Sequence, residues 1–579
     1  MRIRLSDKWV ALAVFLVIAV LFLVPIFSRM TNWGSQDWDQ QFFYRGAARK
    51  TIMDYGQLPL WNPWHCGGTP LLANTQSAQL SPMFLLVLAF GAPVGMKLSI
   101  LLHMAIGMWG MWLLARRMRF STQGAYASAL IFMLSSWFAL KIVAGHVLFF
   151  YMSLVPYVML CMMKGLKDWR YLMLAGLLLT VQLFSGAIYM IFFTPILVVM
   201  FSIVLALRKR SWRPLLMILV IFFAFALTSA VKLLPMTAFL MEHSNPREDI
   251  QYYDGRTLFD SYLSRNQGMY SQDQMFYHTR EEAGSLIEAR IRGEVPWGWH
   301  EYGAYIGYVV LALVLVSFLW WRRVWDLLAM MLIFLWLGVG DYAALNLFKI
   351  FSVFPFLSTL HGPSRMSIMV IFFAALLAGF TVSRLSRLKQ GKTVAWILVG
   401  VIILDLGTVG LVVLKDAFPT EAVEVRDNEE FFHLMVSDPF STQYVNMLQN
   451  IGTLNCYERV HPEVRAIALA NDEGELNPAY KGEAYLLRQD AKPEVEFSPN
   501  RFTVEVTSGT EDTLVLNQNY DQGWYSDAGK VIEVEGKVGV RLEPGEHSVR
   551  FRYLPATFII GAVISILSIM GVMLLWRRR

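Results

Sequence analysis

Long apolar runs alternate with short polar segments along most of the chain. A membrane-spanning helix needs about 20 consecutive, mostly apolar residues, and runs of roughly this length recur from the N-terminal region to residue 414 and again near the C-terminus. The pattern predicts a polytopic α-helical membrane protein with about twelve spanning helices. They are expected at 9–27, 97–115, 124–140, 147–163, 171–185, 189–207, 214–233, 304–321, 325–340, 364–382, 393–414 and 556–576.

Basic residues cluster in alternate loops between these runs, at 116–119, 164–170, 208–213, 321–323, 383–392 and 577–579. If the N-terminus is cytoplasmic, every one of these clusters faces the cytoplasm, as the positive-inside rule requires. We therefore expect a multi-pass protein of the cell inner (plasma) membrane with both termini in the cytoplasm. Three longer segments, 28–96, 242–303 and 415–555, are then expected on the outer side.

Composition agrees with a membrane protein. Hydrophobic residues make up 56% of the 579 residues and charged residues only 16%, whereas a soluble protein carries about 25% charged residues. The net charge of +6 is explained by the basic loops and predicts no nucleic-acid partner. No small-residue cleavage site follows the first run, so we expect it to be a retained helix.

The three cysteines, Cys66, Cys161 and Cys456, form no CxxC pair and no Cys/His cluster. This spacing argues against a zinc or iron–sulfur site. Cys66 and Cys456 both fall on the predicted outer side, and the sequence leaves a disulfide between them open.

The outer segment that follows the predicted transmembrane domain, 1–414, changes character towards its end. From Val504 onward, short runs rich in Val, Leu and Phe are separated by Gly, Asp and Pro turns, which is typical of antiparallel strands. We expect an extracytoplasmic domain over 415–555 that is β-rich from about residue 500 and forms a β-sandwich. The preceding stretch, 421–500, is polar and shows no clear pattern. The run from 556 would anchor this domain in the membrane.

The first outer segment opens with NWGSQDWDQQFFYRGAARKTIMDYGQLPLWNP, residues 32–63. Apolar and aromatic positions recur at helical spacing over 42–55, with Arg45, Arg49 and Lys50 between them. This pattern predicts an amphipathic helix that lies in the membrane interface, with its cations at the height of the lipid headgroups.

The stretch WNPWHCGG follows this predicted helix. Tryptophans are enriched at membrane interfaces, so Trp61 and Trp64 are expected to be interface anchors. Gly67 and Gly68 predict a tight turn. His65, which directly follows Trp64, is a candidate substrate contact.

The run DWDQQFFYRGAARKTIMDYGQLPLWNPWHCGGTPLLANTQSAQLSP resembles the first outer loop of YfhO-type bacterial membrane proteins, which belong to the GT-C superfamily of polytopic glycosyltransferases. Further similar stretches are KLLPMTAFLMEHSNPRE, YGAYIGYVVLAL, LHGPSRM and the C-terminal NYDQGWYSD and EPGEHSVRFRYLP. The resemblance implies a GT-C-like fold and inverting transfer of a sugar from a polyprenyl-phosphate donor. The acceptor would be a glycan, lipid or protein outside the cytoplasm. The resemblance also places the acids of the first outer loop at the active centre.

Asp37 and Asp39 are the candidate catalytic residues. Transfer requires a carboxylate to deprotonate the acceptor hydroxyl, and both acids follow directly on the first span. In an extended segment residues i and i+2 point the same way, so the pair is also a candidate site for Mg²⁺ or Mn²⁺. The alternative is two solvated loop carboxylates. The sequence leaves open which acid is the base, with a slight preference for Asp39.

Basic residues on the outer side are candidates for stabilising the departing phosphate. Arg365, at the outer mouth of a span, is the first of them, since an arginine near a helix N-terminus can hold an anion. The alternative is an arginine that anchors the helix at the headgroups. The further candidate substrate contacts are His146, His361, Lys232 and Arg247. The corresponding loop of GT-C enzymes often holds a second polar or acidic group, but here it carries no acid, only His146 and a lysine.

The sequence leaves two other functions open. A transporter or flippase of a lipid-linked intermediate usually carries ionisable residues within its spans, and Asp405 is an exception among predicted span interiors that are otherwise nearly free of charge. A non-enzymatic scaffold that presents the C-terminal domain is the other alternative. The concentration of charge in the outer segments favours chemistry at the membrane interface.

Overall fold

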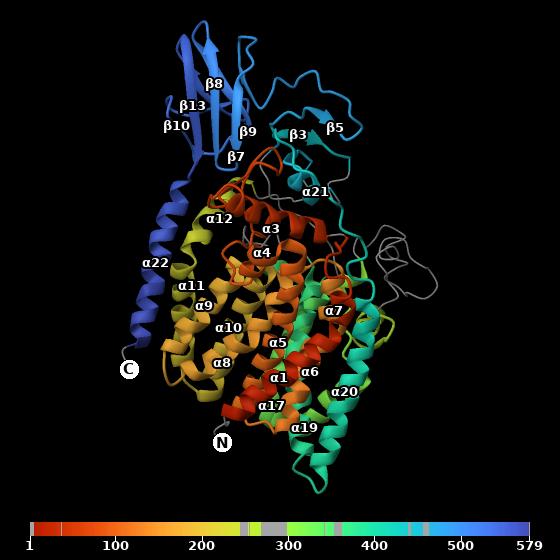
Figure 1. Cartoon of the computed structure of the whole chain (residues 1–579). Helices are drawn as coiled ribbons and strands as arrows, with labels where there is room; N and C mark the ends of the chain where they lie inside the picture. The colour runs from red at the N-terminus through yellow and green to blue at the C-terminus, as the bar shows by residue number, and fades with distance from the viewer. Residues whose placement is uncertain are drawn as a thin grey trace.

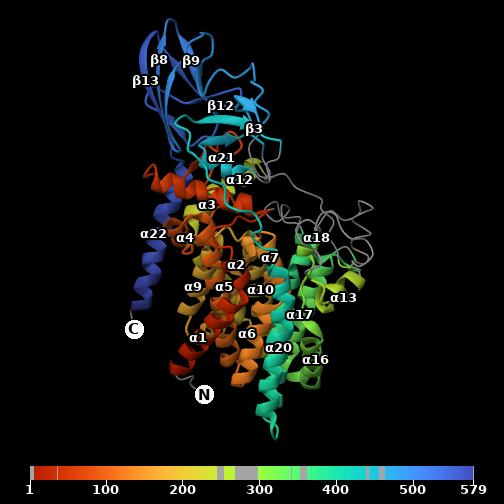
Figure 2. The same cartoon turned by 45° about the vertical axis from the view of Figure 1, so that its right-hand side comes forward.

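The computed structural model of the chain describes residues 5–35, 37–243, 253, 255–267, 298–340, 342–351, 362–437, 442–455 and 463–577. Helices form one elongated body, and the C-terminal strands lie on one end of it (Figures 1 and 2). We call this end of the helical body the outer end and the opposite end the inner end. Both chain termini lie towards the inner end (Figure 1).

Apolar helices build the helical body. Within the described residues, nine helical stretches are long and apolar enough to cross a membrane. They are α1 (Leu5–Phe22), α5 (Ala92–Arg117), α6 (Thr122–Leu134) with α7 (Ser136–Val143), η1 (Val147–Leu154) with α8 (Val155–Gly165), α10 (Ile188–Lys209), α16 (Gly307–Ser317) with η4 (Phe318–Trp320) and α17 (Trp321–Val339), η5 (Pro363–Met366) with α19 (Ser367–Leu385), α20 (Gly391–Leu414), and α22 (Ala556–Arg577).

The remaining described helices are shorter. A tenth span results if η2 (Arg213–Leu215) with α11 (Leu216–Thr228) is joined to α12 (Ala230–His243), although the chain bends by 86° between them. The others are α2 (Val24–Phe27), α3 (Asp37–Met53), α4 (Phe84–Phe90), α9 (Arg170–Phe184), α13 (Gly255–Leu263), η3 (Trp299–Glu301), α18 (Leu347–Phe351) and α21 (Gln443–Leu448).

The predicted spans all correspond to helices. Three features explain why nine long helical stretches stand where twelve spans are predicted: the bend between α11 and α12 and the two features that follow. The predicted span at 171–185 is the short helix α9. The predicted spans at 304–321 and 325–340 form one continuous helical stretch that turns back at η4. In this hairpin the Thr381 hydroxyl donates to the Leu313 carbonyl at 2.8 Å, whereas Phe334 stacks on Phe373 nearer the start of α19. The predicted polytopic helical membrane fold is confirmed.

The centre of the helical body is the contact between α6 and α19. Added Cβ atoms at Gly124 and Gly379 would lie 2.3 Å from the Gly379 carbonyl oxygen and 2.5 Å from the Gly124 carbonyl oxygen, respectively. Small residues let helices in a membrane approach closely. The two helices therefore pack backbone against backbone. This contact fixes the positions of α7, which follows α6, and of η5, which precedes α19.

The C-terminal domain holds a β-sandwich of two four-stranded antiparallel sheets, which confirms the predicted architecture. The strand orders are β10-β13-β8-β7 and β11-β12-β9-β6. Phe502, Val504 and Phe551 are buried between the sheets, on the alternating positions that the sequence pattern indicates. The strands are β6 (Ala484–Leu486), β7 (Glu494–Ser498), β8 (Arg501–Ser508), β9 (Asp512–Asn519), β10 (Trp524–Ser526), β11 (Ile532–Val534), β12 (Lys537–Leu542) and β13 (Gly545–Tyr553).

A small parallel sheet with α21 beside it precedes the sandwich, in the stretch where the sequence shows no pattern. Its strand order is β4-β3-β5. The strands are only two to four residues long, so they carry too few positions for a period of two to be visible. Their bounds are β3 (Phe432–Met435), β4 (Ile451–Thr453) and β5 (Ala470–Asn471).

The first outer segment lies beneath the C-terminal domain (Figure 2). It forms the short hairpin of β1 (Trp61–Asn62) and β2 (Thr69–Pro70), and the Trp61 ring packs 4.6 Å from Tyr553 in the sandwich core. Trp64 is also fully buried. The expectation of interface-anchoring tryptophans was therefore wrong, because the C-terminal domain covers them. The tight turn at Gly67 and Gly68 is confirmed, with φ of 74° and 99°.

The same covering changes the role of α3. This helix begins at Asp37 rather than at the predicted residue 42 and is mostly buried. The Lys50 ammonium lies 2.9 Å from an Asp427 carboxylate oxygen in the C-terminal domain, and Arg45 is 6% exposed. The expectation of an amphipathic helix that lies exposed on the membrane surface was therefore wrong, because the protein itself surrounds these side chains.

Cys66 is disulfide-bonded and Cys161 is a free, buried cysteine. Cys456 lies outside the described residues. The Cys66 amide also donates to the Thr453 carbonyl at 2.8 Å. The backbone of the turn after Trp64 is thus fixed to the C-terminal domain.

Candidate active site

The first turn of α3 lies against the end of α7 at the outer end of the body. The Trp38 indole donates to the Ile142 carbonyl at 2.7 Å. Gly145 follows in a left-handed conformation, with φ of 77°, and a Cβ there would lie 2.5 Å from the Trp38 backbone nitrogen. Glycine is therefore required at this close approach. It brings the next residue, His146, to the side chain of Asp37.

Asp37 is the outermost member of a chain of polar contacts. Its carboxylate oxygen Oδ2 lies 3.2 Å from His146 Nε2. On the other side of the ring, Lys141 Nζ lies 3.2 Å from His146 Nδ1 and 2.8 Å from Glu301 Oε2. An ammonium group only donates, so Nδ1 accepts and Nε2–H donates to Asp37. The network thus fixes the tautomer of His146 and orients the Asp37 carboxylate.

Arg365 completes this group from η5. Its guanidinium forms a bidentate pair with Glu301, with Nε 2.8 Å from Oε2 and the other nitrogen on Oε1. It also lies over the Tyr189 ring, 4.4 Å from the centroid. The sequence predicts Arg365 as a phosphate ligand, but in this structure its guanidinium is already paired with the Glu301 carboxylate.

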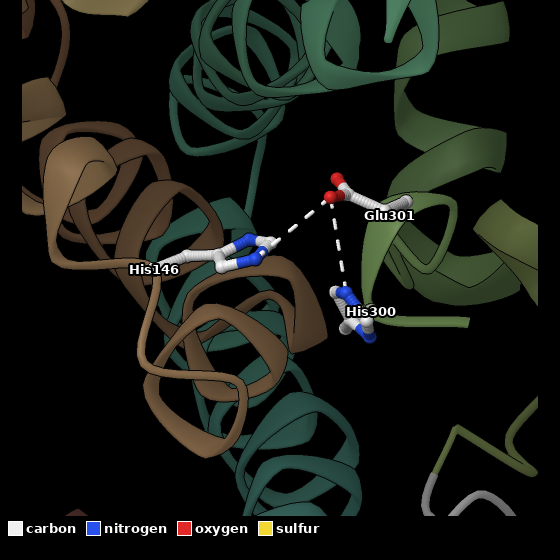
Figure 3. A group of neighbouring side chains, drawn as sticks. All are labelled: His146, His300 and Glu301. Atoms are coloured by element: carbon white, nitrogen blue, oxygen red, sulfur yellow. Dashed lines mark ion pairs between the residues drawn. The ribbon is translucent and has the colours of Figure 1, made fainter. Parts of the chain in front are cut away.

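His300 is the last member, and Figure 3 shows the rings of His146 and His300 both directed at the Glu301 carboxylate. Each imidazole Nε2 lies 3.8 Å from Glu301 Oε1. We call the six residues the Asp37 cluster: Asp37, Lys141, His146, His300, Glu301 and Arg365. The Asp37 side chain is 25% exposed whereas that of Glu301 is 1% exposed. The cluster is therefore a buried network that ends in one accessible carboxylate.

Burial and neighbouring charges set the protonation of the cluster. Burial alone would raise the pKa of Glu301, but Arg365 and Lys141 hold it well below its ordinary value. Burial lowers the pKa of His146, and the Lys141 ammonium lowers it further. Burial also lowers the pKa of His300 well below its ordinary value. Near pH 7 the two histidines are therefore neutral and Glu301 is ionised.

These shifts predict a loss of stability in acid. The folded pKa of each histidine lies below the ordinary value of about 6.5. At pH values between the two, the unfolded chain binds more protons than the folded chain. The free energy of unfolding therefore falls as the pH drops below about 6.5. Each histidine contributes a slope of up to about 1.4 kcal/mol per pH unit. Thermal unfolding at pH 7.5 and pH 5.5 measures this. His300→Gln should show a smaller drop than the wild type, and an equal drop would contradict the assignment.

A divalent cation is a poor fit for this cluster. His146, His300 and Glu301 offer ligand atoms within 4.8 Å of one another, which is a plausible spacing for a metal. However, both Glu301 oxygens already accept from cations, Lys141 and Arg365. A dication here would lie beside two buried positive charges, which disfavours its binding.

Asp39 points away from Asp37. Both acids lie in the first turn of α3, where residues i and i+2 are separated by about 200° around the helix axis, so the expectation of an extended segment with both side chains on one side was wrong. Asp39 instead accepts from the backbone amides of Gln443 at 3.0 Å and Tyr444 at 3.2 Å. These contacts place it at the N-terminus of α21 in the C-terminal domain. The two acids therefore do not form the shared Mg²⁺ or Mn²⁺ site expected from the sequence.

A second set of buried polar groups lies further along α3. Arg45 donates to the Gln41 side chain at 2.7 Å, which in turn donates to Gln76 at 2.7 Å. Lys232 from α12 donates to the carbonyl of the next residue, Ser77. Arg45 acts electrostatically on Lys232, and both cations are almost fully buried. Burial lowers the pKa of Arg45 to about 10, so it remains charged at pH 7.

The other predicted site residues lie elsewhere. His65 is buried against the rings of Phe43 and Tyr44, with centroids 5.3 and 5.5 Å away, beneath the C-terminal domain. Arg247 and His361 lie outside the described residues. The Asp405 carboxylate in α20 pairs with Arg265 and accepts from the Tyr305 hydroxyl at 2.9 Å.

Sequence reasoning missed Glu301, His300 and the role of Lys141. The sequence did contain a signal for these residues. The stretch WHEYG stands immediately before a predicted span, at its outer end, which is the kind of position that made Arg365 a candidate. An acid next to a histidine at such a position predicts a charge partner for a cation on a neighbouring helix.

Comparisons with known proteins find no matching family model and no matching curated protein. Among solved structures, the chain is similar to arabinofuranosyltransferase AftD from Mycobacteria, with 14% identity and a TM-score of 0.49 over 78% of this chain and 32% of AftD. The chain is also similar to ArnT from Cupriavidus metallidurans, with 13% identity and a TM-score of 0.42 over 77% of this chain and 86% of ArnT. The similarity to the oligosaccharyltransferase of Archaeoglobus fulgidus has 14% identity and a TM-score of 0.41 over 77% of this chain and 62% of that enzyme. The chain thus spans about a third of the length of AftD.

Proposed function

We propose that the protein is a membrane glycosyltransferase that moves a sugar from a polyprenyl-phosphate donor to a hydroxyl of a glycan, lipid or protein. The observation that carries this proposal is the Asp37 cluster, in which a buried chain of contacts orients one accessible carboxylate at the outer end of a membrane-embedded body. The resemblance of the first outer segment to YfhO-type GT-C proteins supports the same chemistry, because it places an acid of this loop at the active centre.

The proposed step is a single displacement with inversion at the sugar. Asp37 accepts the proton of the acceptor hydroxyl as its oxygen forms a bond to the anomeric carbon. The bond between that carbon and the phosphate oxygen breaks, and the electron pair leaves with the polyprenyl phosphate. A positioned base of this kind contributes about 10²- to 10⁴-fold in rate. His146 acts by positioning, since its Nε2–H holds one carboxylate oxygen of Asp37.

Arg45 and Lys232 are the proposed ligands of the donor phosphate, in place of Arg365. Arg45 is two turns after Asp37, about 12 Å along the helix axis, but its guanidinium reaches back to Gln41. Two buried cations beside each other are costly without an anion, whereas Arg365 already has Glu301. A phosphate between α3 and α12 would be neutralised within reach of the Asp37 carboxylate.

This assignment predicts opposite effects on binding and stability. Arg45→Gln and Lys232→Gln should each weaken the binding of polyprenyl phosphate about tenfold, since a charge-assisted hydrogen bond contributes about 1.5–3 kcal/mol. Without lipid, the same variants should unfold at the same or a higher temperature, because a buried repulsion is removed. Binding measured by native mass spectrometry, together with thermal unfolding, tests both effects.

Arg49→Gln is the matched control, because Arg49 lies on the same helix and donates to the Leu88 carbonyl at 3.3 Å. It should bind the lipid like the wild type. Unchanged lipid binding by both Arg45→Gln and Lys232→Gln would contradict the phosphate site but leave the role of Asp37 standing.

The orientation follows from the basic loops. Arg116 and Arg117 at the end of α5, and Arg208 and Lys209 at the end of α10, lie at the inner end of the body. We infer that this end faces the cytoplasm and that the Asp37 cluster faces the outer side of the inner membrane. A donor with its chain in the bilayer would then deliver its sugar at the outer membrane surface.

A further inference from the structure

A cavity opens at the inner end of the body, far from the Asp37 cluster. It has a volume of about 510 Å³ and lies between the ends of α5, α8, α10 and α17. Its walls are apolar and are formed by side chains such as Met159, Phe201 and Met330. Cavities of about 300–1,000 Å³ with mostly apolar walls are typical of sites for small organic ligands.

Cations surround this apolar cavity. Arg117, Lys167, Arg208 and Lys209 come from three helices and their ends, and all line the cavity with exposed side chains. Asp326, which also lines it, forms an ion pair with Arg208. Three of the four cations therefore remain without an acid among the residues that line the cavity. The surface thus combines a positive rim with an apolar interior.

We propose that this cavity binds an anionic phospholipid. The phosphodiester would lie at the rim with Arg117, Lys167 and Lys209, and the first part of an acyl chain would cover the methionine and phenylalanine walls. Basic pockets between transmembrane helices are suited to anionic headgroups, with about 1 kcal/mol per cation near the surface. A soluble anion would leave the apolar walls in contact with water. This site does not depend on the proposed glycosyl transfer.

The test uses the full-length protein in vesicles of equal amounts of phosphatidylcholine and phosphatidylglycerol, followed by native mass spectrometry of the protein with its retained lipid. The wild type should retain phosphatidylglycerol with a several-fold preference over phosphatidylcholine. The variant R117Q/K167Q/K209Q should lose that preference. Leu205→Trp, which fills the cavity but keeps every charge, should retain less phosphatidylglycerol.

The matched control is R387Q/K389Q/K392Q, which removes the same charge at the end of α19 and the start of α20, where these residues do not line the cavity. It should keep the preference. Equal loss in this control, or full retention in Leu205→Trp, would show general attraction of anionic lipid to a basic surface and overturn the proposal. Displacement of the lipid by excess inorganic phosphate would also overturn it in favour of a soluble anion.

Discussion

Asp37→Asn is expected to reduce the turnover of sugar transfer by about 10²- to 10⁴-fold while leaving donor binding and the unfolding temperature close to those of the wild type. The amide keeps the size of the side chain and still accepts from His146 Nε2–H, 3.2 Å away, but it cannot take up the acceptor proton. Transfer by purified protein in proteoliposomes, together with binding of polyprenyl phosphate, measures both quantities.

Asp39→Asn is the matched control, because the same change is made two residues away on the same helix. Asp39 accepts two backbone amides at the start of α21, and an asparagine oxygen is also a good acceptor at a helix N-terminus. This variant should keep most of its activity. Equal loss in both variants, or full activity in Asp37→Asn, would contradict the assignment of Asp37 as the base.

Glu301→Gln is expected to produce the largest loss of stability. Glu301 is the shared carboxylate of Lys141 and Arg365, and its neutralisation leaves two buried cations without their ion-pair partner. Breaking a buried ion pair in this way costs about 3–5 kcal/mol. Thermal and denaturant unfolding of the detergent-solubilised protein should show this loss, along with reduced transfer because His146 is no longer held through Lys141.

A double-mutant cycle separates the charge effect from a packing effect. In a Lys141→Met background, Glu301→Gln should cost clearly less than in the wild type, because one of the two cations has already been removed. An equal loss of unfolding free energy in both backgrounds would mean that Glu301 stabilises the fold without neutralising the charge of Lys141.

The membrane body could be predicted from the sequence because each span carries its own signal. Apolar length, basic loop ends and the alternating strands after Val504 are local patterns, and the structure confirms a helical body with a β-sandwich. The hairpin of α16 and α17 and the short α9 affect the count of long helices but not the order of elements.

The candidate site could be predicted only in part, because its contacts join distant segments. Asp37, His146 and Arg365 were singled out separately, and the structure brings all three into one cluster. Glu301 was missed because its role appears only when Lys141 and Arg365 approach it from other helices. Trp61 was assigned to the membrane interface because nothing in its local sequence reveals that the sandwich packs over it.

The chemical fate of the lipid carrier tests the central claim most directly. Proteoliposomes that hold the wild-type protein, a sugar-loaded polyprenyl phosphate and an acceptor hydroxyl should convert the carrier to bare polyprenyl phosphate, as read by mass spectrometry, and Asp37→Asn should leave it loaded. A carrier that stays loaded with the wild-type protein but moves from one leaflet to the other would contradict glycosyl transfer and indicate a flippase.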